Sequence, residues 1–304
     1  MRYLSAHAQH IGSRRYQQDS FGFADPGDGD FLAHGGFLAV LCDGMGGMEH
    51  GDVASETAVR AMLDAYARKT PAESIPAALE RSAREANQRV IQAALKLGLR
   101  EGVGTTLVAS VTHGQSLYFI SVGDSAVYHV HAGEARMLNR PHVFANLLDE
   151  ASAMGKISSL DAERHPEREA LTSYIGIRVL EEIDYNTEAW PLAEGDAILL
   201  ASDGMFKTLD AGEITLCLTG HPESWPRALV ERTLARKSPG QDNVTVVSIA
   251  PASAALGEWA PRTEESPHPG DAPATPAPRN WLVAGMFLLL VAIGVGGYWY
   301  FSGN

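Results

Sequence analysis

Four apolar runs in this chain each meet an aspartate, and these junctions constrain the fold more than any other feature. FLAVLC ends at Asp43, LYFISVG at Asp124 and AILLAS at Asp203, whereas Asp242 comes just before NVTVVSIA. Short apolar runs between Gly, Ser or Asn turns are typical of buried β-strands. Because a sheet gathers the ends of its strands along one edge, we expect these four carboxylates to lie near one another.

A fifth aspartate, Asp19, precedes another short strand-like run, SFGF. Taken singly, any of these residues could be a turn aspartate that bonds its own backbone. Several carboxylates on one edge repel one another unless a cation offsets their charge. Oxygen ligands without a His or Cys cluster favour Mg²⁺ or Mn²⁺ over zinc. A pair of such ions is a known arrangement for activating water in displacement at phosphorus.

The segment after Asp43 carries glycines at positions 44, 46, 47 and 51. Glycine lets backbone adopt positive φ and approach a ligand closely. After Gly51 apolar residues recur at helical spacing, so we expect a strand, a glycine loop and a helix in succession. Such a unit could hold a metal or a phosphate, or it could be an ordinary turn.

The rest of the first 250 residues mixes helices with hairpins. The pattern predicts a helix over 73–98, then strands in TTLVASVTH, SLYFISVGD, AVYHVHAG and ARML joined by short turns. Residues 142–174 are predicted to be helical, YNTEAW and DAILLASD to be strands, and 210–218 and 223–236 to be helices. Consecutive hairpins with grouped helices favour an α+β layered sandwich over a parallel sheet.

Composition narrows the function classes. The chain has 304 residues with 45% hydrophobic composition, enough for one large domain or two small ones. Its formal net charge of −13 argues against nucleic acid as a partner, because phosphate backbones are held by clustered Lys and Arg. The two cysteines, Cys42 and Cys217, lie in apolar runs and predict buried thiols in a reducing compartment.

The C-terminal part differs sharply from the rest. Residues 251–280 contain seven prolines and predict an extended linker after a domain of residues 1–250. Residues 281–301, WLVAGMFLLLVAIGVGGYWYF, carry no charge and are long enough for a transmembrane helix with aromatic residues at both ends. The N-terminus does not resemble a signal peptide. We therefore expect a single-pass protein of the inner (cytoplasmic) membrane, with its main domain in the cytoplasm and Arg279 on that side.

The motifs DGMGG, GTTLVAS, VGDS, SDG and DNVT occur in this order within residues 1–250. Their order and spacing resemble the metal-dependent Ser/Thr protein phosphatases of the PPM family, also called protein phosphatase type 2C. The resemblance implies two antiparallel β-sheets packed as a sandwich and flanked by helices. It also implies hydrolysis of phosphoserine and phosphothreonine in proteins, by attack of a water bound to two Mn²⁺ or Mg²⁺ ions.

The resemblance assigns the metal ligands residue by residue. Asp43 would bridge both ions, and the carbonyl of Gly44 would bind one of them. Asp203 and Asp242 would hold the other. Asp19 would act through a metal-bound water.

Two further residues are assigned in the same way. Asp124 would share a third, weaker metal site with Asp203, as in bacterial members. Arg14, five residues before Asp19, matches the family's phosphate-binding arginine, although its neighbour Arg15 is an alternative. A guanidinium suits this role because its planar fork pairs two phosphate oxygens.

The chain departs from the family pattern in several places. Met48 replaces the His of DGMGGH, and Met45 stands where some members have a proposed general-acid His. A metal-bound water, His50 or His142 is left as the general acid. Ala126 replaces the Arg of VGDSR, and the usual Thr-x-Asp-His-Ser is LNRPHVF here. Residues 143–180 correspond to the flap region, where substrate preference is often set.

Three functions are open at this point. The first is a membrane-tethered phosphatase for phosphorylated proteins, with a Ser/Thr kinase or its substrates as partner by family habit. The second is a degenerate module that binds a phosphoprotein or a kinase, which Ala126 favours. The third is a phosphoesterase for small molecules. Retention of Asp43, Asp203 and Asp242 together argues for catalysis, because a binding module has no need of clustered carboxylates.

Overall fold

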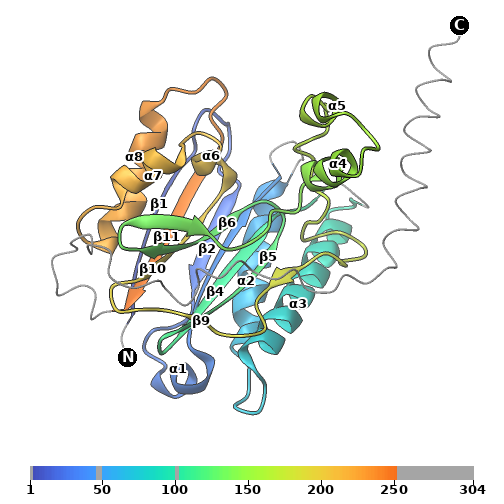
Figure 1. Ribbon diagram of the computed structural model, residues 1–304. Coiled ribbons are helices and arrows are strands. Elements are labelled where there is room, and N and C mark those ends of the chain that lie inside the picture. The colour runs from blue at the N-terminus through green and yellow to red at the C-terminus, as the bar shows by residue number, and fades with distance from the viewer. Residues whose placement is uncertain (1–2, 46–49, 100–102, 252–304) are drawn as a thin grey trace, which may run out of the picture. The chain divides into compact units, whose positions relative to one another are not determined.

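Two antiparallel sheets form the centre of the described part of the chain, which is residues 3–45, 50–99 and 103–251 of the computed structural model (Figure 1). In spatial order, the first sheet consists of β1 (Tyr3–His10), β11 (Val244–Pro251), β10 (Ala197–Ala201), β6 (Ala126–His131) and β7 (Glu134–Met137). The second consists of β2 (Asp19–Phe23), β3 (Phe37–Asp43), β4 (Leu107–His113), β5 (Ser116–Val122) and β8 (Asp184–Tyr185), and β9 (Trp190–Pro191) pairs with β5.

The sequences of the inner strands β3 and β10 are apolar because both faces of their sheets are covered at these positions. In β3, Phe37, Ala39 and Leu41 belong to the core shared with Ile198 and Val247 of the first sheet. The alternate residues of β3 belong to a second core, which includes side chains of α2 (Gly51–Tyr66) and α3 (Ile75–Lys96). Successive side chains of a strand point to opposite faces, so one continuous apolar run serves two cores.

Helices cover the outer face of the first sheet in the same way. Trp225 and Leu229 of α8 (Trp225–Ala235) and Ile214 of α7 (Ala211–Cys217) pack with β10 and β11. A capping box begins α7, in which Asp210 accepts from the backbone of Glu213 and Glu213 accepts from the backbone of Asp210. The remaining helical segments are α1 (Gly29–Gly35), α4 (Phe144–Ala153), α5 (Ser159–Glu163), α6 (Asp203–Phe206) and the short 3₁₀ helix η1 (Pro222–Ser224).

The structure confirms the predicted α+β sandwich and corrects parts of it. β1 was not predicted, and the predicted helix over 142–174 is only partly helical, as α4 and α5. YNTEAW is not one strand, because β8 ends and β9 begins within it. β11 extends one residue past the predicted domain end, to Pro251.

The predicted linker and membrane span lie outside the described residues. Among the helices within residues 3–251 that the structure describes, none has the length and apolar character needed to cross a membrane.

Candidate metal centre

Asp19 and Asp43 lie directly opposite each other on neighbouring strands, because β2 pairs with β3 in the register Asp19↔Asp43. Like charges in facing positions of a sheet destabilise it. Repulsion between Asp19 and Asp43 therefore destabilises the folded state when both are charged.

Asp19 is only 4% exposed and is bonded on one oxygen. Its Oδ2 accepts hydrogen bonds from the hydroxyls of Ser202 (2.9 Å), which follows β10, and Thr245 (2.6 Å), which lies in β11. Its Oδ1 is buried without a hydrogen-bond partner. Burial raises the pKa of Asp19 to about 6, against the opposing effect of the two hydroxyls, and the charges of Asp203 and Asp242 raise it further.

Asp43 ends β3 and is held by its backbone. Its N–H donates to the hydroxyl of Thr106 (3.0 Å), and its carbonyl accepts from the Thr106 N–H (2.8 Å) and the Thr105 hydroxyl (2.8 Å). Burial raises the pKa of Asp43 well above its usual range, and the charges of Asp19, Asp203, Asp124 and Asp242 add to the effect. Five predicted carboxylates thus act on one another electrostatically.

Gly44 sits where only glycine fits. Its N–H donates to the carbonyl of Gln18 (3.0 Å), and a Cβ at this position would overlap the carbonyl oxygens of Gly51 and Gln18. The start of α2 therefore packs directly on the backbone that follows Asp43. The predicted approach of the Gly44 carbonyl to a metal stays a prediction, and residues 46–49 lie outside the described part.

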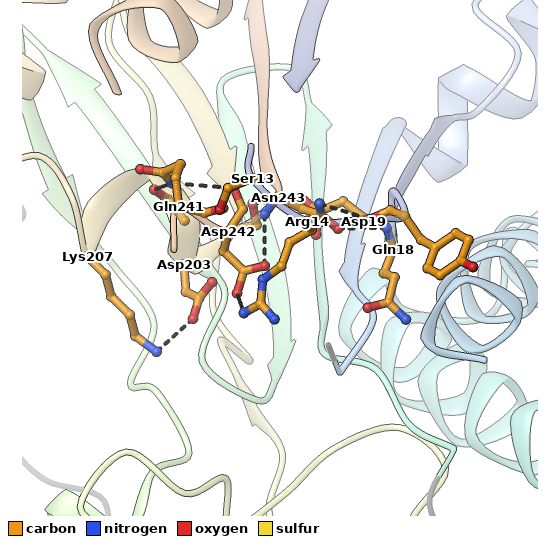
Figure 2. A network of polar contacts seen from close by, with 12 residues as sticks. Ser13, Arg14, Gln18, Asp19, Asp203, Lys207, Gln241, Asp242 and Asn243 are labelled. Atoms are coloured by element: carbon orange, nitrogen blue, oxygen red, sulfur yellow. Dashed lines mark hydrogen bonds and ion pairs between the residues drawn. The ribbon is translucent and has the colours of Figure 1, made fainter. Parts of the chain in front are cut away.

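Asp242 is paired with an arginine. Arg14 Nη2 lies 2.7 Å from Asp242 Oδ2, and Figure 2 shows the guanidinium pointing at this carboxylate. Arg14 therefore lies beside one of the predicted metal ligands. The Arg14 side chain is 42% exposed, so it remains accessible from solvent.

Asn243 fixes the segment that carries Arg14. Its Oδ1 accepts from the Gln18 N–H (2.7 Å), and its Nδ2 donates to the carbonyls of Ile11 (2.8 Å) and Tyr16 (3.1 Å). One buried amide thus closes the loop between β1 and β2 against the start of β11. Figure 2 shows this network between Gln18 and Asn243.

Asp203 and Asp124 are joined by a lysine. Lys207 Nζ lies 2.7 Å from Asp203 Oδ2 and 3.0 Å from Asp124 Oδ2. Burial raises the pKa of Asp124, the charge of Asp203 adds to this effect, and Lys207 opposes both. For Lys207, burial alone would lower the pKa, but the two carboxylates raise it above its ordinary value.

The donor set around Asp43 fits a divalent cation. Asp19 Oδ1 is a buried acceptor without a donor, and the pKa of Asp43 is raised by burial and then by the charges of the neighbouring carboxylates. Oxygen-only donors of this kind suit Mg²⁺ or Mn²⁺. As they stand, no three His, Cys, Asp or Glu side chains in the described ranges are grouped tightly enough to enclose an ion. Which residues bind each ion therefore stays a prediction.

The two candidate general acids differ in setting. His142 is buried, and its Nδ1 accepts from the Gly123 N–H (3.1 Å). Burial lowers the pKa of His142, opposed by Glu182 and Asp184. A neutral imidazole bonded in this way braces the turn that carries Asp124. His50 is exposed just before α2, in a left-handed conformation.

Sequence reasoning missed Lys207 and Asn243 as members of the site. Asn243 lies within the DNVT motif, so a signal for it was present. Lys207 follows Asp203 by four residues, the spacing at which helical side chains meet. Its contact with Asp124 joins residues far apart in the chain and has no local signal.

Comparison with known proteins decides the family. The family model described as protein phosphatase 2C matches residues 7–238, which is more than half of the chain. This chain belongs to the protein phosphatase 2C family. It is a metal-dependent serine/threonine protein phosphatase, as the resemblance implied.

Individual relatives agree with this assignment. The serine/threonine phosphatase stp of Listeria innocua is 33% identical over 215 residues, covering 70% of this chain and 83% of that protein. The PPM phosphatase MsPP of Mycobacterium smegmatis, solved with cacodylate, is 29% identical with a TM-score of 0.62, covering 81% of this phosphatase and 97% of that chain. The catalytic domain of PstP, solved with two manganese ions, shares the fold at 24% identity and a TM-score of 0.63, covering 81% and 97% of the two chains.

Proposed function

We propose that the phosphatase binds two Mn²⁺ or Mg²⁺ ions beside the strand ends that carry its clustered aspartates. Asp43 would bridge them, with the Gly44 carbonyl on one and Asp203 and Asp242 on the other. Asp19 would complete the site through water. The observation that carries this proposal is the facing Asp19–Asp43 pair, in which Oδ1 of the buried Asp19 has no hydrogen-bond partner.

The ions would supply Lewis acidity that activates water and offsets the charge of the phosphate. The residues of the chain fix the positions of the groups proposed to hold the ions. Ser202 and Thr245 hold Asp19 on one oxygen, so its orientation is fixed. Thr105 and Thr106 fix the backbone of Asp43.

Arg14 is proposed to bind the phosphate of the substrate. Its guanidinium carries five N–H donors, and the pairing with Asp242 Oδ2 uses Nη2. Other donors of the fork remain to orient a phosphate beside the carboxylates. The Asp242 contact holds the guanidinium in place, which reduces the entropy lost when a phosphate binds.

The catalytic proposal is tested by phosphate release from a phosphothreonine peptide with the full-length protein. We expect release with Mn²⁺ and none with EDTA, and we expect Asp203→Asn to abolish it while the circular dichroism spectrum stays unchanged. Full activity of a folded Asp203→Asn protein would contradict the ligand assignment. No release under any divalent metal from a folded protein would favour the phosphoprotein-binding alternative.

We also propose that residues 281–301 anchor the phosphatase in the cytoplasmic membrane, with the catalytic domain in the cytoplasm. The uncharged run with aromatic ends supports this proposal. Tethering through residues 251–280 would raise the effective concentration near a membrane-bound Ser/Thr kinase or its substrates. A chain ending at residue 251 should leave the membrane fraction and stay active. Retention of that shortened chain in the membrane fraction would contradict the anchor.

A further inference from the structure

Lys207 occupies the space between two of the site's carboxylates. It follows the one-turn helix α6, and its N–H donates to the Asp203 carbonyl (2.9 Å). This turn returns the side chain onto Asp203, at the i,i+4 spacing that brings helical side chains together. Nζ then bonds Asp203 Oδ2 (2.7 Å) and Asp124 Oδ2 (3.0 Å) at once.

These contacts differ from an ordinary surface ion pair. The side chains of Asp124 and Asp203 are 10% and 20% exposed, although that of Lys207 is 40% exposed. Exposed pairs contribute about 0–1 kcal/mol, because water competes for both partners. Here the carboxylates are largely removed from water and repel each other, so a cation between them offsets a cost that solvent cannot.

We propose that the Lys207 ammonium takes the place of the third divalent ion that the family resemblance predicts between Asp124 and Asp203. This inference rests on the proposed two-ion site, which it leaves intact around Asp43. The phosphatase would then bind two exchangeable ions and carry a fixed third cation of its own. Lys207 acts in this proposal as a positioning residue for Asp124 and Asp203.

The contacts at this position suit an ammonium. The two carboxylate oxygens lie 3.0 Å and 2.7 Å from Nζ, both within hydrogen-bonding distance. An ammonium has three donors and no acceptor, so it satisfies both carboxylates and still has one N–H to spare. A divalent ion could enter only by displacing Lys207 from both partners.

A third, weaker contact reaches toward the predicted flap region. Glu169 Oε2 lies 3.9 Å from Lys207 Nζ, and the Glu169 side chain is 68% exposed. At this distance and exposure the pair contributes little to stability. Its position nevertheless places Lys207 between the carboxylates and the segment that follows α5.

The test counts Mn²⁺ bound to metal-stripped full-length protein, from the loss of the electron paramagnetic resonance signal of the free ion. We expect two ions for the wild type and a third, weaker one for Lys207→Met, which keeps length but removes charge. Lys207→Arg should stay at two, as should the control Lys96→Met, in an exposed residue of α3. Three ions on the wild type, or two on a folded Lys207→Met protein, would overturn the inference. No bound ion on the wild type would instead contradict the proposed site itself.

A second variant keeps the question answerable if Lys207→Met does not fold. Asp124→Asn removes a ligand of the predicted third site without touching Lys207. If Lys207 replaces the third ion, this variant binds two Mn²⁺, as the wild type does. A count that falls by one ion relative to the wild type would show that Asp124 holds a metal and would overturn the inference.

Discussion

Buried carboxylates near the two ends of β10 differ in how completely they are hydrogen-bonded. Before the strand, Asp196 is 1% exposed and accepts hydrogen bonds from His129 Nε2 (2.8 Å), His131 Nδ1 (2.7 Å) and the Ala193 N–H (2.7 Å). After the strand, the neighbourhood of Asp203 includes Asp19, which is 4% exposed and has one oxygen without a partner.

The pKa values follow this contrast. Burial alone would raise the pKa of Asp196, but the hydrogen bonds from His129 and His131 hold it below its usual value. At the other end, burial raises the pKa of Asp19 to about 6. The chain thus satisfies Asp196, whereas it leaves one oxygen of Asp19, in the proposed metal site, without a partner.

The largest effect is expected from a substitution in the proposed metal site. Asp43→Asn removes the carboxylate proposed to bridge both ions while it keeps the side-chain volume. We expect phosphatase activity with Mn²⁺ to fall at least about a thousandfold, which corresponds to roughly 4 kcal/mol of transition-state stabilisation. Without metal, the same variant should be at least as stable as the wild type, since a repelled charge is gone. Steady-state assays and thermal unfolding in EDTA measure the two effects.

Asp19 contributes to the pH dependence of stability of the metal-free protein. Its raised pKa means that the folded state binds a proton more tightly than the unfolded state, for which the pKa is about 3.9. In the metal-free protein, the contribution of Asp19 to the free energy of unfolding is therefore full below about pH 4. It falls by about 3 kcal/mol as pH rises through about 6.

The comparison of wild type with Asp19→Asn makes this effect measurable. In EDTA the variant should be the more stable protein at pH 7, and the difference should shrink toward pH 4.5. Excess Mn²⁺ should stabilise the wild type more than the variant at pH 7. A metal-free wild type that is more stable than Asp19→Asn at pH 7 would contradict the raised pKa.

A substitution of Asp196, at the other end of β10, should lower stability without affecting metal binding. Asp196→Asn replaces the charged acceptor of His129 and His131, and hydrogen bonds to charged groups contribute about 1.5–3 kcal/mol. We expect the free energy of unfolding to fall by about 2 kcal/mol, with Mn²⁺ affinity unchanged. Chemical denaturation and metal titration test both statements. A loss of metal affinity with unchanged stability would reverse the assignment of the two ends.

The smallest effect concerns Arg14. Arg14→Lys keeps the charge but loses the planar fork, so we expect kcat/KM for a phosphopeptide to fall about tenfold, or roughly 1.4 kcal/mol. Arg15→Lys is the matched control and should leave kcat/KM unchanged. An effect of the Arg15 change equal to that of the Arg14 change would favour the alternative phosphate ligand.

How far the sequence predicted this molecule depends on where each signal lies. The strand at 37–43 was predictable because both of its faces are buried, which makes the run continuously apolar. β1 was missed because YLSAHAQH is half exposed and pairs only with β11 at the edge of its sheet. Residues 142–174 were over-predicted as helix because their polar pattern does not distinguish a short helix from an irregular segment.

The carboxylates of the site and Arg14 were predictable, whereas Lys207 and the ion pairs that both cationic side chains make were not. Each aspartate marks the end of an apolar run, so its place on the sheet edge follows from local sequence. The partners of those aspartates do not. Asp242 pairs with Arg14, 228 residues away in the sequence, and Asp124 pairs with Lys207, 83 residues away. Such contacts depend on the tertiary fold, which sequence pattern alone does not place.

The most direct test of the central claim is a crystal structure of the phosphatase with Mn²⁺, with anomalous diffraction recorded at the manganese edge. We expect two anomalous peaks among Asp43, Asp203 and Asp242, and Lys207 still bonded to Asp124. Asp196 at the other end of β10 should show no peak. The absence of anomalous density at Asp43 in crystals grown with excess Mn²⁺ would contradict the claim that this edge is left for a divalent ion.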